Sequence, residues 1–225
     1  GKGGVGKTVV SANLAAALAQ RGERVLVLDA DLGLANLDVV LNLYPRTTLH
    51  DVFTGKAMLD DAIVPAPGGF SVLLAGSGMV EYSRLTPELR TRLRDTIDAL
   101  SPRFDVILLD TGAGISDVVL FSVSLADEVL LVVTPEPTSM TDAYATIKVL
   151  STQQRREVIR LVVNQTGRLG EARAIRGQLQ RVVDHYVNAA AVQPLKLELV
   201  GEIPTDAAVR DAVQKRQLLL EVYPG

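Results

Sequence analysis

Short runs of Val, Leu and Ile recur along the chain, and few polar residues interrupt them. Strands of a parallel sheet covered on both faces have this composition, because neither face meets water. Each run ends on a polar residue or a proline. The runs that predict strands are Arg24–Asp29, Phe104–Asp110, Glu128–Thr134, Ile159–Asn164 and Leu197–Pro204.

Segments of helical character separate these runs. The first, Thr8–Gln20, is mostly Ala, Leu and Val, and Arg21 and Gly22 follow it as a basic last turn and a glycine stop. Strands that alternate with helices predict an α/β fold, a mostly parallel, doubly wound sheet with helices on both faces and right-handed crossovers. The other predicted helices are Thr86–Leu100, Asp117–Leu125, Thr138–Leu150, Gly170–Tyr186 and Thr205–Arg216.

The least regular part of the chain is Tyr44–Gly78, for which we expect a short helix over Thr48–Thr54 and a strand over Phe70–Leu74. No linker rich in Pro, Gly or Ser divides the 225 residues. Open α/β sheets of this length commonly form one domain, so we predict a single domain over residues 1–225.

Composition excludes several kinds of site. There is no cysteine, which rules out disulfides, thiolate zinc sites and iron–sulfur ligation, and which suits a reducing cytoplasm. No apolar run reaches the roughly 20 residues that a transmembrane helix needs. The formal net charge of -3 gives no overall attraction to nucleic acid or acidic lipid. We therefore predict a cytoplasmic protein.

The eight residues from Gly1 to Thr8 match the pattern G-x-x-x-x-G-K-[ST] and lead directly into a predicted helix. Backbone N–H groups of such a loop surround a phosphate chain, the lysine reaches the outer phosphates, and the hydroxyl binds Mg²⁺. The alternative is a tight glycine turn before an unrelated helix. ATP and Mg²⁺ are the predicted cofactors, and the predicted binding residues are Gly3, Gly4, Val5, Gly6, Lys7 and Thr8.

A phosphate-binding loop of this kind normally follows a buried strand, and the chain begins at Gly1 without one. We therefore expect a domain truncated at its N-terminus, and also at its C-terminus. A missing strand would leave a slot in the middle of the sheet, with unpaired backbone groups that lower stability.

Acidic residues end two of the predicted strands. One residue separates Asp29 from Asp31, so one carboxylate can act on the metal side and the other on the attacking water. Asp110 ends an apolar strand and is predicted to hold Mg²⁺ through water. The alternative for Asp110 is a helix cap.

Lys2 lies inside the loop, although a second lysine is not required to bind one nucleotide. Lys2–Thr8 reads KGGVGKT and resembles the deviant Walker A motif of the MinD and ParA family of ATPases. The resemblance implies an ATP-dependent homodimer in which Lys2 crosses to the phosphates of the partner copy. The alternative is a solvated lysine at the edge of a loop.

The same resemblance implies roles for other residues. Asp31 positions the attacking water, Asp29 supports the metal shell, and Asp110–Gly114 forms a switch loop that moves when the γ-phosphate is lost. Asn164 and the turn Ile203–Asp206, with Pro204 and Asp206, resemble the family's adenine-contacting positions. A cap and a plain turn are the alternatives for these two.

Two further stretches, Asp29–Leu43 and Thr134–Lys148, resemble the flagellar-number regulators called FlhG or FleN, a branch of the MinD-like proteins. Such proteins carry an N-terminal segment that engages an SRP-type GTPase or a transcription regulator, and a C-terminal amphipathic membrane helix. The resemblance thus implies a regulatory ATPase with a protein partner, located at the inner face of the cell membrane through a segment outside this sequence.

Between Arg155 and Arg181 the chain carries seven arginines against Glu157 and Glu171. This arginine segment suits DNA, acidic lipid or an acidic partner, and the alternative is a solvated helix face. DNA contact would indicate a ParA-type partitioning ATPase instead of a regulator.

A metabolic ligase on the same fold is a third hypothesis for the function, although no additional acid–base cluster is present to build its substrate pocket. Iron–sulfur carriers of this fold are excluded because cysteine is absent. Tyrosine kinases of this fold are excluded because only Tyr223 lies near the C-terminus.

Overall fold

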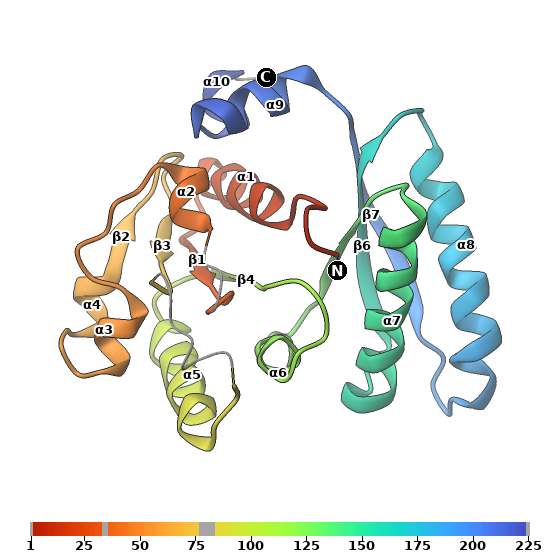
Figure 1. The fold of residues 1–225 in the computed structure, drawn as a ribbon, viewed down its shortest axis with the longest axis horizontal. Coiled ribbons are helices and arrows are strands. Elements are labelled where there is room, and N and C mark those ends of the chain that lie inside the picture. The colour runs from red at the N-terminus through yellow and green to blue at the C-terminus, as the bar shows by residue number, and fades with distance from the viewer. Residues whose placement is uncertain (1, 33–35, 77–83, 224–225) are drawn as a thin grey trace. The chain divides into compact units, whose positions relative to one another are not determined.

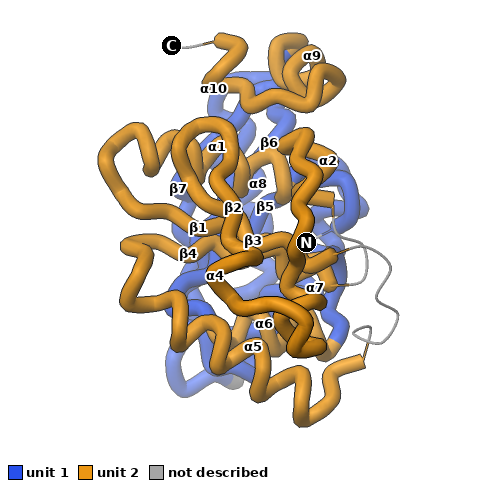
Figure 2. Tube along the Cα trace, turned by 90° about the vertical axis from the view of Figure 1, so that its left-hand side faces the viewer, with its two compact units in different colours: residues 1–6, 113–116, 126–206 blue, residues 7–112, 117–125, 207–225 orange. Residues whose placement is uncertain are grey.

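The computed structural model describes residues 2–32, 36–76 and 84–223 (Figure 1). The chain divides into two compact units, which Figure 2 colours separately. Unit 1 holds residues 1–6, 113–116 and 126–206, and unit 2 holds residues 7–112, 117–125 and 207–225. The phosphate-binding motif crosses from one unit to the other between Gly6 and Lys7.

The sheet of unit 2 has the strand order β2-β3-β1-β4. β1 runs parallel to both β3 and β4, whereas β2 is antiparallel to β3. β1 and β4 pair residue for residue, so that Asp29 lies opposite Asp110 at the carboxyl ends of the two strands. The strands are β1 Val25–Asp29, β2 Ile63–Pro65, β3 Ser71–Leu73 and β4 Val106–Asp110.

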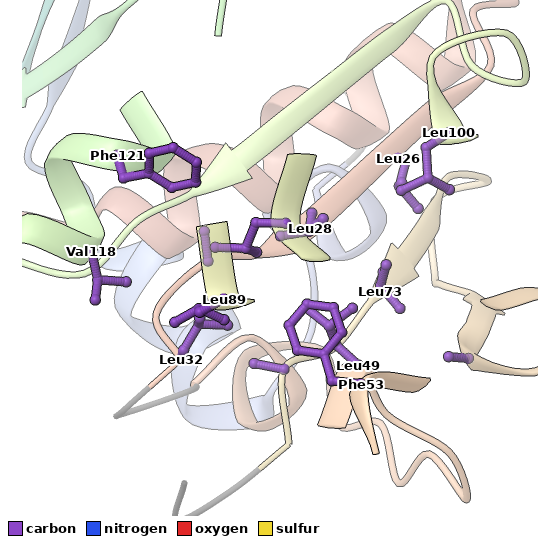
Figure 3. Packing of buried hydrophobic residues seen from close by; sticks show 14 residues of the cluster. Leu26, Leu28, Leu32, Leu49, Phe53, Leu73, Leu89, Leu100, Val118 and Phe121 are labelled. Atoms are coloured by element: carbon purple, nitrogen blue, oxygen red, sulfur yellow. The ribbon is translucent and has the colours of Figure 1, made fainter. Parts of the chain in front are cut away.

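Helices cover both faces of this sheet. Leu26 and Leu28 of β1 point to one face, where they pack with Leu89 of α5 and Phe121 of α6 (Figure 3). Val25 and Val27 point to the opposite face, which α1 covers with a row of buried alanines. The helices of unit 2 are α1 Lys7–Gln20, α2 Leu37–Leu41, α3 Leu49–Phe53, α4 Leu59–Ala62, α5 Pro87–Leu100, α6 Asp117–Ser124, α9 Ala207–Lys215 and α10 Leu219–Val222.

The small side chains of α1 let other segments approach it closely. Ala12, Ala15 and Ala16 are fully buried. Gly68 adopts φ +82°, and a Cβ atom there would lie 2.7 Å from the Cβ of Ala16 and 2.8 Å from Leu218. Only glycine fits this position, since both the backbone conformation and the space exclude a side chain.

The sheet of unit 1 is parallel throughout, with the order β5-β6-β7. Two helices pack against it, and α8 buries residues spaced three or four apart, as an amphipathic helix does. These buried residues are Ala172, Ile175, Leu179 and Val183. The elements are β5 Leu130–Val133, α7 Pro137–Gln154, β6 Val158–Thr166, α8 Glu171–Tyr186, a 3₁₀ turn over Asn188–Ala190 and β7 Lys196–Pro204.

The pairing of β6 with β7 is irregular in two places. Val200 has no partner between the pairs Leu161–Leu199 and Val162–Gly201, so it forms a bulge. Gln165 forms a second irregularity and adopts φ +60°, the left-handed region that few residues other than glycine visit. The second irregularity immediately follows Asn164, and it therefore shapes the carboxyl end of β6.

The fold class predicted from the sequence is confirmed, and every predicted strand and helix is present within a few residues of its expected bounds. The strands form two hydrogen-bonded sheets in the described residues, where the sequence predicted one. The sequence analysis missed α2, α4, β2, α10 and the 3₁₀ turn, all of which are five residues or shorter. The single domain and the slot in the sheet remain predictions.

Among the described residues, no helix is both long enough and apolar enough to cross a bilayer. α8 and α9 have strongly amphipathic sequences, and α8 turns its apolar face to the sheet of unit 1.

Shortening one core side chain should destabilise the protein measurably. Leu28 is 1% exposed in the centre of the cluster of Figure 3, so Leu28→Ala should lower the free energy of unfolding by about 2–5 kcal/mol. Val213 of α9 is 43% exposed, and Val213→Ala should change it by less than about 0.5 kcal/mol. Urea denaturation measures both; equal effects would contradict the described core.

Candidate nucleotide and metal site

In unit 2, the first turn of α1 lies beside the carboxyl end of β4. Lys7 and Thr8 begin the helix, directly after the glycine-rich loop. The hydroxyl of Ser11 donates to Oδ1 of Asp110 at 3.1 Å, and the hydroxyl of Thr8 also hydrogen-bonds this carboxylate. The predicted metal residues Thr8 and Asp110 are therefore in contact, although the role in metal binding remains a prediction.

Asp29 is buried at the end of β1, with 1% of its surface exposed. Its Oδ1 accepts the backbone N–H of Asp31 at 3.1 Å, while its Oδ2 has no hydrogen-bond partner among the described residues. Burial raises the pKa of Asp29 to about 7, and the carboxylates of Asp110 and Asp31 add to the effect. A carboxyl group with this pKa is only partly ionised at neutral pH, and a bound cation would favour its ionised form.

The charges around Lys7 do not fully balance. Burial lowers the pKa of Lys7, and the attraction of Asp110 and Asp31 opposes that shift. Burial also raises the pKa of Asp110, against the hydrogen bonds of Thr8 and Ser11 and the charge of Lys7. Lys7 therefore compensates Asp110 and Asp31, whose charges also act on the buried Asp29, and this excess of carboxyl groups favours binding of a cation.

Mg²⁺ is the cation that these residues fit. No three His, Cys, Asp or Glu side chains of the described part of the chain are arranged to hold a metal by themselves. Mg²⁺ does not need such a cluster, because it usually keeps several waters and binds through one or two carboxylates and phosphate oxygens. The unpartnered Oδ2 of Asp29 and the hydroxyl-bonded carboxylate of Asp110 supply oxygen ligands of this type.

Gly112 leaves room for the side chain of Asp31. A Cβ atom at Gly112 would lie 3.1 Å from the carboxylate of Asp31, which is closer than an unstrained contact. The predicted water-positioning carboxylate therefore lies beside the first glycine of the predicted switch loop.

In unit 1, the glycine-rich loop turns through left-handed backbone conformations. Gly4 adopts φ +81° and Gly6 adopts φ +91°, so both positions favour glycine. The side chain of Val5 is buried between them, with 2% exposure. Gly3 lies beside Ala113, whose Cβ atom would be 3.8 Å from a Cβ at Gly3. Gly1 is outside the described residues.

Lys2 is held by residues at the start of α7. Its Nζ donates to Oε2 of Glu136 at 3.0 Å and to Oγ1 of Thr138 at 2.9 Å. The side chains of Lys2 and Glu136 are 35% and 61% exposed, so the ion pair is in contact with water. Lys2 thus has side-chain partners in unit 1, and its role at a dimer interface remains a prediction.

Asn164 and Pro204, two of the predicted adenine-contacting residues, lie at the carboxyl ends of neighbouring strands. Asn164 is opposite Ile203, and Pro204 is opposite Thr166. Pro204 and Asp206 are both exposed. The structure brings these positions together at one edge of the sheet, while their contact with adenine remains a prediction.

Part of the arginine segment is engaged in contacts within unit 1, so fewer of its arginines can bind a partner than the charge of the segment indicates. Arg156 donates to the carbonyl oxygens of Ala126 and Asp127, and Arg160 pairs with Glu128. Arg176 donates to the carbonyl of Leu197 at 2.9 Å. These three arginines form contacts within unit 1. The exposed members of the segment are Arg155, Arg168, Arg173 and Arg181.

Sequence reasoning missed three residues of the site: Ser11, Glu136 and Thr138. Ser11 follows Thr8 by three residues, which is one helical turn and a usable signal. Glu136 and Thr138 come directly after β5, at an edge where ligands of parallel sheets bind. Their partner Lys2 is more than 130 residues away in sequence, and nothing local indicates the pairing.

The raised pKa of Asp29 predicts a pH-dependent stability. Without a cation, the Asp29 carboxyl stays protonated up to about pH 7 in the folded protein but only up to about pH 4 in the unfolded chain. The free energy of unfolding should therefore fall as the pH rises through that interval. Asp29→Asn removes this contribution, which amounts to a few kcal/mol. We expect the variant to gain stability relative to the unmodified protein from pH 5 to pH 8.

Urea denaturation at the two pH values, without nucleotide or Mg²⁺, measures this difference. Asp98→Asn changes an exposed carboxyl of the same unit and serves as the control, for which no relative gain is expected. An equal change in the free energy of unfolding between the two pH values for Asp29→Asn and the unmodified protein would contradict the buried position of the Asp29 carboxyl.

The chain is similar to known proteins over its whole length. The antiactivator FleN of Pseudomonas aeruginosa is 45% identical over 224 residues, which cover 100% of this chain and 78% of FleN. The flagellum site-determining protein YlxH of Helicobacter pylori is 33% identical over 226 residues, covering 100% of this chain and 74% of YlxH.

Among solved structures, the septum site-determining protein MinD of Pyrococcus horikoshii, complexed with Mg-ADP, superposes with a TM-score of 0.79 at 28% identity. The match covers 100% of this chain and 86% of that protein. The family model described as the CobQ/CobB/MinD/ParA nucleotide binding domain matches residues 1–219. The chain therefore belongs to the CobQ/CobB/MinD/ParA nucleotide-binding family.

Proposed function

We propose that the protein is a Mg²⁺-dependent ATPase that works as a regulatory switch: ATP closes a homodimer, and hydrolysis opens it again. The glycine-rich loop with Lys7 binds the phosphates, and Asp29, Asp110 and Thr8 surround the metal. Asp31 positions the attacking water. Pro204 and Asp206 contact the adenine at the edge of β7. Mg²⁺ bound in this way would draw charge from the phosphates and stabilise the developing charge during transfer to water.

The difference between the partners of the two loop lysines carries this proposal. Lys7 lies among Asp110 and Asp31 in unit 2, whereas Lys2 is held by Glu136 and Thr138 in unit 1. One lysine of the loop therefore has the acidic environment of a nucleotide site, and the other has separate partners. This division supports a role for Lys2 outside the nucleotide site of its own copy.

The contact that holds Lys2 is weak enough to be exchanged. Exposed ion pairs of this type contribute about 0–1 kcal/mol, because water and salt screen them. The phosphates of a nucleotide carry several charges, and a lysine gains more from them than from one exposed carboxylate. Lys2 can therefore leave Glu136 when a second copy presents bound ATP.

Loss of the γ-phosphate moves the switch loop, and Gly112 of this loop lies beside Asp31. A displacement of the loop from Asp110 to Gly114 alters the space beside Asp31, because Gly112 lies so near that a Cβ atom there would be 3.1 Å from its carboxylate. Gly114 adopts φ +87°, a conformation suited to a loop that turns sharply. The switch loop thus couples the water-positioning carboxylate to backbone rearrangement.

The regulated process is control of the number or placement of flagella. One relative is named an antiactivator and another a flagellum site-determining protein, which supports a protein partner such as a transcription regulator or an SRP-type GTPase. The protein acts in the cytoplasm and at the inner face of the cell membrane. DNA partitioning is less supported, since Arg156, Arg160 and Arg176 are engaged within unit 1.

Light scattering tests the switch. With the hydrolysis-blocking Asp31→Ala change, the protein should be monomeric with ADP and double in mass with ATP and Mg²⁺. Adding Lys2→Ala should restore the monomer mass with ATP, since the lysine that crosses the interface is lost. Lys56→Ala removes an exposed lysine of unit 2 and should leave the dimer intact.

Undiminished dimerisation of the Lys2→Ala protein would remove the reason for assigning a dimerising switch. A monomer mass with ATP even when Lys2 is present would favour the metabolic alternative on the same fold.

A further inference from the structure

The hydroxyl of Ser11 in α1 bonds a carboxylate that is distant in sequence. Its Oγ donates to Oδ1 of Asp110 at 3.1 Å, across 99 positions. A hydroxyl inside a helix often donates instead to the carbonyl oxygen four residues earlier in the same helix. Thr96, Ser122 and Thr146 of this chain do so. Ser11 therefore has a partner that helix formation alone does not provide.

The strand fixes the backbone of Asp110 but not the plane of its carboxylate. Asp110 lies opposite Asp29 in the paired strands β1 and β4, and its carbonyl oxygen accepts the N–H of Ala30 at 2.8 Å. Only 5% of the residue is exposed. The terminal torsion of an aspartate side chain has a broad energy minimum, so the carboxylate can still turn. Hydrogen bonds to its two oxygens determine the direction of that plane.

Two hydroxyls of α1 bond this carboxylate, and all three residues belong to unit 2. Thr8 and Ser11 are three positions apart, so they lie on the same side of the helix. An ionised carboxylate has about four lone-pair sites, so two hydroxyl donors leave acceptor positions for water held by a metal. Thr8 is assigned to the metal in the proposed site. Ser11 has no such assignment, so its hydroxyl can hold Asp110 whether or not the metal is bound.

We propose that Ser11 is a positioning residue that orients the carboxylate of Asp110 for Mg²⁺. This inference rests on the proposed Mg²⁺-dependent binding of a nucleotide by the glycine-rich loop. A hydrogen bond from a hydroxyl to an ionised carboxylate is stronger than a bond between neutral groups, so it can restrain the direction of the carboxylate. The oxygens of Asp110 then face the metal without a reorientation step during binding.

Packing and helix formation do not explain a serine at position 11. α1 buries Ala12, Ala15 and Ala16, so small side chains suit this helix, and Ser11 itself is only half-buried. Alanine also has a higher helix propensity than serine. An alanine at position 11 would therefore suit the helix at least as well, and the contact with Asp110 accounts for the hydroxyl. For the same reason, we expect a protein with Ser11→Ala to fold.

The Mg²⁺ dependence of ADP binding tests this assignment, and the proposed switch stays monomeric with ADP. In Ser11→Ala, the Mg²⁺ concentration that half-saturates the complex of protein and ADP should rise about tenfold, as expected when one hydrogen bond to a charged group is lost. The dissociation constant of ADP measured with a chelator of Mg²⁺ should not change, because the loop and Lys7 still bind the phosphates. Titrations with a fluorescent ADP measure both quantities.

Two further variants separate the contact with Asp110 from general effects of substitution. Ser11→Thr keeps a hydroxyl at the same position and should restore the Mg²⁺ requirement of the unmodified protein. Ser101→Ala is the matched control, because Ser101 of unit 2 donates its hydroxyl to the carbonyl oxygen of Ile97 at the end of α5. This control removes a hydroxyl in the same way and should leave both measured quantities unchanged.

A purely structural role of Ser11 predicts another pattern. ADP binding would then weaken equally with Mg²⁺ and with the chelator, because the whole first part of α1 would be displaced. That result would overturn the assignment, as would an unchanged Mg²⁺ requirement in Ser11→Ala or a Ser11→Thr protein that behaves like Ser11→Ala. The proposed nucleotide and metal site fails separately, if ADP binding by the unmodified protein does not respond to Mg²⁺.

Discussion

The parallel pairing of β1 with β4 is the constraint on which the rest of unit 2 depends. The pairing places Asp29 directly opposite Asp110 at the carboxyl ends of two strands whose other residues are apolar. Helices cover both faces of these strands, so the carboxyl groups are buried with them. The same packing that stabilises the sheet therefore makes the ionised acids costly. The protein can recover that cost by binding a cation at this point, and α1 begins there with Lys7 and Thr8.

Much of this arrangement could be predicted from the sequence. The apolar runs predicted the strands because both faces of the sheet are buried, and Gly22 marked the end of the first helix by its backbone preference. The motif from Gly1 to Thr8 predicted a phosphate-binding loop because its glycines let the backbone surround a phosphate chain and its lysine reaches the outer phosphates. Asp29 and Asp110 were identified because ligands bind at the carboxyl ends of parallel strands.

What sequence reasoning missed has two physical origins. Elements such as α2, α4 and β2 have at most five residues, too few for a hydrophobic period to appear. The contacts of Lys2 with Glu136 and of Asn164 with Val5 join residues more than 130 positions apart. Pairing of this kind depends on topology and not on local composition, so it becomes visible only in three dimensions.

The most direct test of this account is the melting temperature of the protein with ATP, measured with Mg²⁺ and with a chelator of Mg²⁺. If the acids of β1 and β4 require the cation, saturating ATP with Mg²⁺ should raise the melting temperature by about 5–10 °C, and ATP alone by much less. The Mg²⁺-dependent part should disappear in Asp110→Asn. Equal shifts with and without Mg²⁺ would contradict the claim that these carboxylates form the metal side of a nucleotide site.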